Sequence, residues 1–128
     1  MLLIDKLSAK PVYEQIADGY EKEILTGVLF PGDTFPSLRE LSVTLGINPN
    51  TIQKAYAELA RRGVMCSAPG SGCYVTVGAR EAIKARARER LTELRRLAAE
   101  LCAAGLDENE ITAAVSAGCA DVRTAKTE

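Results

Sequence analysis

The sequence predicts a mainly helical protein with one small β-hairpin, divided into an N-terminal domain over residues 1–78 and a helical C-terminal region over residues 79–128. Three observations lead to this expectation. Apolar residues recur at helical spacing in three early segments, two short β-rich runs flank a glycine-containing turn, and an amphipathic, charged segment follows. A chain of 128 residues holds one domain with a small appendage and leaves no room for a large catalytic body.

Composition argues against an enzyme and against a metal protein. The chain has no histidine, and its 4 cysteines form no C-x-x-C pair. We therefore expect no catalytic residues, no metal site and no cofactor, and we interpret the cysteines as reduced structural thiols, with metal or redox roles as the alternative. No apolar stretch reaches the roughly 18 residues that span a bilayer, and the N-terminus lacks the pattern of a signal peptide, so we expect a cytoplasmic protein without membrane contact.

The first helix is predicted in PVYEQIADGYEKEILTG, which Pro11 begins and Gly27 ends. One apolar stripe runs along it, made of Val12, Ile16, Tyr20, Ile24 and Leu25. The following VLFPGDTFPS contains a Pro-Gly turn and a second proline that excludes helix before it, so it is predicted to be a short extended connection.

The second helix is predicted in SLRELSVTLG. Ser37 and Glu40 have the spacing of a reciprocal capping pair at a helix start, and Gly46 is expected to end the helix in the left-handed conformation. The side facing the core is predicted to consist of Leu38, Leu41 and Leu45.

The third helix begins abruptly at Asn48, a good N-cap, followed by Pro49 at the first helical position, and is predicted to end near Arg62. Its buried side is predicted to be Ile52, Ala55, Tyr56 and Leu59, which leaves Asn50, Thr51, Gln53 and Lys54 exposed. Two helices joined by a glycine-containing turn, the second polar at its exposed start, are typical of a helix-turn-helix, whose second helix enters the DNA major groove. Amide side chains can read base edges there.

The run VMCSAPGSGCYVTV has two short β-rich stretches around a turn, which predicts a hairpin. A hairpin directly after a recognition helix is a wing, and its tip residues Gly70, Ser71 and Gly72 can bring backbone N–H groups close to a phosphate. An ordinary flexible hairpin loop is the alternative.

The C-terminal region is predicted to form one long amphipathic helix from Ala79 to Ala104, ended by Gly105, and a second helix that an Asp107–Glu110 capping pair begins. The run Arg86, Arg88 and Arg90 is expected to be a solvated helix face. Because two helices bury little surface alone, their apolar stripe is predicted to pack on a second copy, forming a homodimer. The predicted dimer residues are Ile83, Ala87, Leu91, Leu94, Ala98, Leu101, Ile111 and Val115. Folding back onto the chain's own first domain is the alternative.

Several linked motifs resemble the winged helix-turn-helix of the GntR family of bacterial transcription regulators: YEQI, G-x-L-x-PGD, PS-x-REL, LG-x-NPNT, AY-x-EL and the G-x-G-x-Y-V wing, over roughly Pro11 to Val77. The short tail is similar to that of the YtrA-like branch. The resemblance implies a regulator that binds double-stranded DNA and controls transporter operons and its own gene. We expect a repressor, because a bound homodimer occludes a promoter, and a pseudo-palindromic operator, because a two-fold dimer presents two recognition helices. The resemblance also implies DNA contacts by Arg39, by Asn48, Asn50, Thr51 and Gln53, and by Gly70 and Gly72.

Each of these residues has a competing structural role. Arg39 could pair with an acidic neighbour, Asn48 is expected to be a cap whether or not it touches DNA, and Lys54 is expected to meet phosphate rather than a base. The wing has no basic residue, so its contacts are expected to add little to the salt dependence of binding. Together with Pro49 and Gln53, where some relatives hold arginine, this predicts modest, amide-led affinity. A winged helix that binds protein, and a sensor of an unidentified small-molecule effector, remain the rival interpretations.

Overall fold

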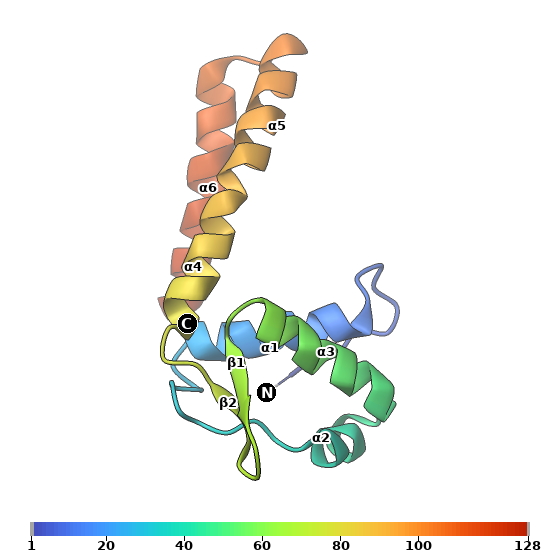
Figure 1. The fold of residues 1–128 in the computed structure, drawn as a ribbon. Helices are drawn as coiled ribbons and strands as arrows, with labels where there is room; N and C mark the ends of the chain where they lie inside the picture. Colours follow the sequence, from blue (N-terminus) through green and yellow to red (C-terminus); the bar gives the residue numbers. More distant parts are fainter. Residues whose placement is uncertain (1, 128) are drawn as a thin grey trace. The chain divides into compact units, whose positions relative to one another are not determined.

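The computed structural model describes residues 2–127, which are mainly helical with one two-stranded antiparallel sheet, as predicted (Figure 1). The chain divides into two compact units, Met1–Ala87 and Arg88–Glu128. The division lies inside a helix. The elements are α1 (Val12–Leu25), α2 (Leu38–Leu45), α3 (Pro49–Arg61), β1 (Met65–Ala68), β2 (Gly72–Val75), α4 (Ala79–Glu89), α5 (Leu91–Ala103) and α6 (Glu108–Thr127).

The core of the N-terminal unit lies where α3 packs against α1 and α2. Its fully buried large side chains are Ile16, Ile24, Ile52, Leu59, Val64 and Val75. Three aromatic rings meet beside them, with centroids 5.0 Å apart for Tyr20 and Phe35 and 5.9 Å apart for Phe35 and Tyr56. Burial raises the pKa of the Tyr20 hydroxyl to about 12. The residues predicted to bury one side of α3 are all in this core.

Two leucines assigned to the core from spacing are exposed instead. Leu25, in the last turn of α1, is 51% exposed because its neighbour Ile24 occupies the buried position. Leu38, the first residue of α2, is 37% exposed, whereas Leu41 is buried one turn later. The capping prediction for α2 is confirmed in one direction, because the Ser37 hydroxyl accepts a hydrogen bond from the Glu40 N–H at 3.1 Å.

The extended connection before α2 lies beside the hairpin and forms hydrogen bonds with β2. The backbone N–H of Gly32 donates to Val75 O and that of Phe35 donates to Cys73 O, both at 2.9 Å. Thr34 forms a β-bridge with Tyr74. The hairpin is therefore held against the core by this segment as well as by α3.

The C-terminal unit is a hairpin of α5 and α6, with Gly105 in the turn between them at φ 105°. The prediction of one continuous helix from Ala79 to Ala104 is wrong, because α4 ends at Glu89 and α5 begins after Arg90. Asp107 caps α6, but its carboxylate accepts from the Asn109 N–H at 3.2 Å rather than from Glu110. Across the helices of residues 2–127, none is long and apolar enough to cross a bilayer.

Candidate nucleic-acid interface

The start of α3 is built by a short run of local signals. Gly46 takes the left-handed conformation that ends α2, with φ 65° and ψ 37°. Two residues later the Asn48 side chain accepts a hydrogen bond from the Asn50 N–H at 2.8 Å, with Pro49 opening the helix. This tight junction exposes the first turn of α3, where Asn48 and Asn50 lie at the surface and Thr51 is half-buried.

The opposite side of α3 anchors the helix. Ile52, Ala55 and Leu59 are fully buried, and Tyr56 is nearly so. The Tyr56 hydroxyl also donates to the carbonyl of Pro36 at 2.7 Å, which ties α3 to the residues just before α2. Burial raises the pKa of this hydroxyl, so it stays protonated and keeps donating. Gln53 and Lys54 are consequently held on the exposed side of a rigid helix.

Arg39 lies in the first turn of α2 and is exposed. The structure shows no pairing with an acidic neighbour: among the residues whose side chains it describes, 2–125, none makes a hydrogen bond or ion pair with the Arg39 guanidinium. Its five N–H donors are therefore available to a partner outside the chain.

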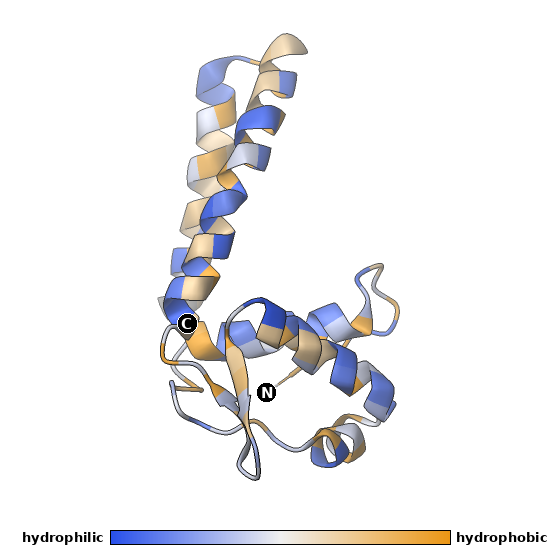
Figure 2. Ribbon diagram, viewed as in Figure 1, coloured by the Kyte–Doolittle hydropathy of each residue, from blue (hydrophilic) through white to orange (hydrophobic). Residues whose placement is uncertain are grey.

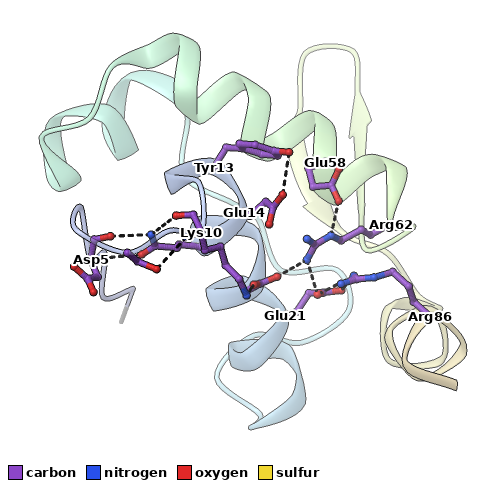
Figure 3. Close-up of polar contacts among 11 residues, drawn as sticks. Asp5, Lys10, Tyr13, Glu14, Glu21, Glu58, Arg62 and Arg86 are labelled. Atoms are coloured by element: carbon purple, nitrogen blue, oxygen red, sulfur yellow. Dashed lines mark hydrogen bonds and ion pairs between the residues drawn. The ribbon is translucent and has the colours of Figure 1, made fainter. Parts of the chain in front are cut away.

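Lys54 has a neighbour that sequence reasoning missed. Its ammonium nitrogen lies 4.3 Å from the centroid of the Tyr13 ring, a cation–π contact between α3 and the start of α1. The Tyr13 hydroxyl donates to Glu14 at 3.2 Å (Figure 3). Because Tyr13 and Lys54 are far apart in the sequence, no local pattern indicates their contact. The contact holds the lysine stem along the protein surface.

The wing tip is exposed, and two of its residues adopt positive φ angles, which glycine takes readily. Gly70 has φ 77° and Gly72 has φ 78°, values that favour glycine, and the Ser71 N–H donates to Ala68 O at 3.0 Å to close the turn. A Cβ built on either glycine meets nothing within 4 Å, so the tip is open to a partner. The strands pair Cys66 with Tyr74 and Ser67 with Cys73, and all 4 thiols of the chain are free.

One shallow groove brings the three elements together. It has a volume of about 260 Å³, and its lining includes Leu38 from α2, Gln53 from α3 and Ser67 from β1. Leu38, which was expected in the core, instead lines this groove next to Arg39. The start of α2, the exposed side of α3 and the first wing strand therefore border one surface.

A helix-turn-helix with an exposed polar start to its second helix, followed directly by a β-hairpin, defines the class of winged helix-turn-helix proteins. Comparison with known proteins gives the same answer. Residues 12–75 match the family model described as "Bacterial regulatory proteins, gntR family". The chain belongs to the GntR family of bacterial transcription regulators.

Individual relatives agree. The chain is 42% identical over 80 residues to the transcriptional repressor YtrA of Bacillus subtilis, a match covering 62% of each chain and so less than two thirds of that relative's length. A transcriptional regulator from Oenococcus oeni superposes with a TM-score of 0.70 at 32% identity, covering 91% of this chain and 97% of the other. The DNA-binding domain of AraR, solved in complex with operator ORX1, superposes with a TM-score of 0.52 at 30% identity, covering 59% of this chain and 93% of that domain.

Proposed function

We propose that this protein represses transcription by binding a pseudo-palindromic operator as a homodimer. The observation that carries the proposal is the exposed polar side of α3, where Gln53 lines the same groove as Leu38, the residue before the exposed Arg39. Amides and guanidinium groups are the donors that recognise base edges and phosphates. The name of the relative YtrA, a repressor, and the AraR–operator complex support it.

The residues proposed to contact DNA are Arg39, Asn48, Asn50, Thr51, Gln53, Lys54 and the wing tip Gly70, Ser71 and Gly72. Arg39 and Lys54 supply the charge, and the wing tip supplies only backbone N–H groups and one hydroxyl. Lys54 is proposed to reach phosphate, because its ammonium group lies on the exposed side of α3, over the Tyr13 ring at the start of α1.

The α5–α6 hairpin is proposed to form the dimer interface. Leu91, Leu94 and Leu97 are 58%, 43% and 51% exposed, and Val115 on α6 is 41% exposed. A groove of about 400 Å³ lies between the helices, lined mainly by apolar side chains. In Figure 2, hydrophobic and hydrophilic residues alternate along both helices, as in helices that bury one side. Clustered exposed apolar side chains mark interaction surfaces, and a second copy supplies the matching stripe.

Ile83 is not included in the proposed dimer interface. Ile83 is half-buried against the core of its own N-terminal unit, because the first turns of α4 pack there. The residues that remain in the proposed interface are Ala87, Leu91, Leu94, Ala98, Leu101, Ile111 and Val115.

The test is binding of the purified protein to the DNA upstream of its own gene, after footprinting locates the protected segment. Arg39→Ala and Gln53→Ala are each expected to weaken binding by about 1–3 kcal/mol, or roughly 5- to 150-fold, as fluorescence anisotropy would measure. Arg61→Ala is the matched control. It removes the same charge at the far end of α3, where Arg61 pairs with Glu58 at 2.6 Å, and is expected to bind as wild type.

Thermal unfolding and sedimentation of each variant show whether fold and dimer are intact. If Arg39→Ala and Gln53→Ala bind the footprinted DNA like wild type while remaining folded dimers, the proposed DNA interface is wrong.

A further inference from the structure

Glu21 on α1 is a charged residue inside the N-terminal unit, only 6% exposed. Two arginines from different elements hold its carboxylate. Arg62, at the C-terminal end of α3, donates from Nη1 to Oε1 at 2.7 Å. Arg86 on α4 donates from its Nη1 to Oε1 at 3.0 Å and to Oε2 at 2.8 Å (Figure 3). We call Glu21, Arg62 and Arg86 the clasp.

Arg62 has further partners that make it the fixed member of the clasp. Its guanidinium also contacts Asp18 at 2.8 Å and Glu58 at 2.7 Å, and its side chain is 6% exposed. Arg86 is 37% exposed, and its partner among residues 2–127 is Glu21. Removing one member of a buried ion pair strongly destabilises a protein when the other charge is left buried without a partner. Removing Arg86 does not leave Glu21 without a partner, because Arg62 remains bound to it.

Arg86 attaches α4 to the N-terminal unit at a second point along the helix. Ala79, the first residue of α4, is fully buried, and Ala82 and Ile83 are half-buried against the same core. Arg86 adds one more attachment a turn further on, about 10 Å along the helix axis from Ala79 at 1.5 Å per residue. A helix attached only near its first residues can pivot, whereas attachments along two turns fix its direction.

We propose that the clasp is a positioning device that fixes the direction in which α4 leaves the DNA-binding unit, and thereby the half-site spacing that the dimer accepts. This inference rests on the proposed function, because it requires the tail to form the homodimer. The recognition helix and the chain leading to the tail are joined through one carboxylate, with Arg62 at the end of α3 and Arg86 on α4. A dimer with a free α4 would tolerate several spacings and bind none of them as tightly, since ordering it on DNA would cost conformational entropy.

The experiment uses the full-length protein and a duplex that wild type enriches from a randomised pool. From it we would make a single half-site duplex and a series in which the centre is lengthened one base pair at a time up to about half a helical turn. Wild type is expected to bind the selected spacing at least about tenfold more tightly than the worst spacing. Arg86→Ala is expected to reduce that ratio to about threefold or less, while its affinity for the single half-site stays within about twofold of wild type.

Two further variants sharpen the result. Arg86→Lys should restore the spacing preference, because a single nitrogen of Arg86 makes both contacts with Glu21 and an ammonium can do the same. Arg88→Ala removes an equal charge from an exposed position two residues further on and should behave as wild type.

The possible outcomes distinguish failure of the clasp from failure of the proposed homodimer. An Arg86→Ala protein with the wild-type spacing preference contradicts the clasp. So does one whose half-site affinity and melting temperature fall together with its affinity for the paired sites, since that indicates only general destabilisation. A wild-type protein that is monomeric, or that binds paired and single half-sites equally, instead contradicts the proposed homodimer.

Discussion

Glu58, near the end of α3, lies between two arginines of the same helix end. It accepts from Arg61 Nη2 at 2.6 Å and from Arg62 Nε at 2.7 Å. The hydrogen bond from Arg61, together with that from Arg62, outweighs burial and lowers the pKa of the Glu58 carboxyl to about 2. Cations at a helix C-terminus also interact favourably with the helix dipole. The charges here therefore stabilise the end of α3 that carries Arg62.

This pKa predicts how stability depends on pH. The ordinary pKa of Glu58 is 4.5, so its stabilising contribution is complete above about that pH and is lost as the pH falls toward 2. Because Arg61 is largely exposed, solvent screens the pair, and we expect a loss of about 1 kcal/mol. Urea unfolding between pH 6 and pH 2.5 would measure it. Glu58→Gln should be less stable than wild type at pH 6, with the difference shrinking at pH 2.5; a constant difference would contradict the assignment.

At the scale of elements, α3 has a buried side that anchors the helix and an exposed side that is proposed to contact DNA. Its buried side fits the helical period in the sequence, and the structure confirms every residue assigned to it. The tail shows where the same method fails. The apolar spacing continues without change across Arg90, yet α4 ends before it and no side chain caps the start of α5. Periodicity indicates which side is apolar, but it carries no signal for a one-residue interruption.

The two sides of α3 should respond differently to alanine. Ile52→Ala removes a fully buried side chain and is expected to lower the free energy of unfolding by about 2–5 kcal/mol. Gln53→Ala, one residue away and exposed, should leave stability within about 0.5 kcal/mol of wild type. Chemical denaturation of the two variants gives both values. Equal destabilisation by the two changes would mean that α3 is not oriented as described.

At the scale of the whole molecule, the tail is proposed to join two copies of the chain, so that the dimer carries two DNA-binding units. Leu94 lines the α5–α6 groove, and Leu94→Glu would place a carboxylate in the proposed interface. Burying a charge without a partner should weaken the dimer by at least about 2 kcal/mol, or roughly thirtyfold. Ala99→Glu, on an exposed position of α5 outside the groove, is the matched control. Sedimentation velocity over a concentration series would distinguish them, and an undisturbed Leu94→Glu dimer would place the interface elsewhere.

The charge distribution predicts a shallow dependence of DNA binding on salt. The first 78 residues hold 7 Lys or Arg against 8 Asp or Glu, and β1, β2 and the turn between them carry no charge. If Arg39 and Lys54 of each protomer neutralise one phosphate apiece, the slope of log K against log salt is about −4. Anisotropy titrations from 50 to 300 mM salt would measure it. A much steeper slope would show that other cations, such as those of the tail, contact DNA.

By itself the sequence determined the class of this protein, its helices up to α3, its hairpin and the exposed start of α3. Caps, turn glycines and apolar periods are local, so they can be read within a few residues. Only the tertiary structure decided which charges are paired. Arg86 was expected on a solvated face but binds the buried Glu21, Lys54 lies over Tyr13, and Arg39 has no partner among the side chains that the structure describes. Such contacts join residues from separate elements, and electrostatic energy depends on distance and burial in space, which no local pattern encodes.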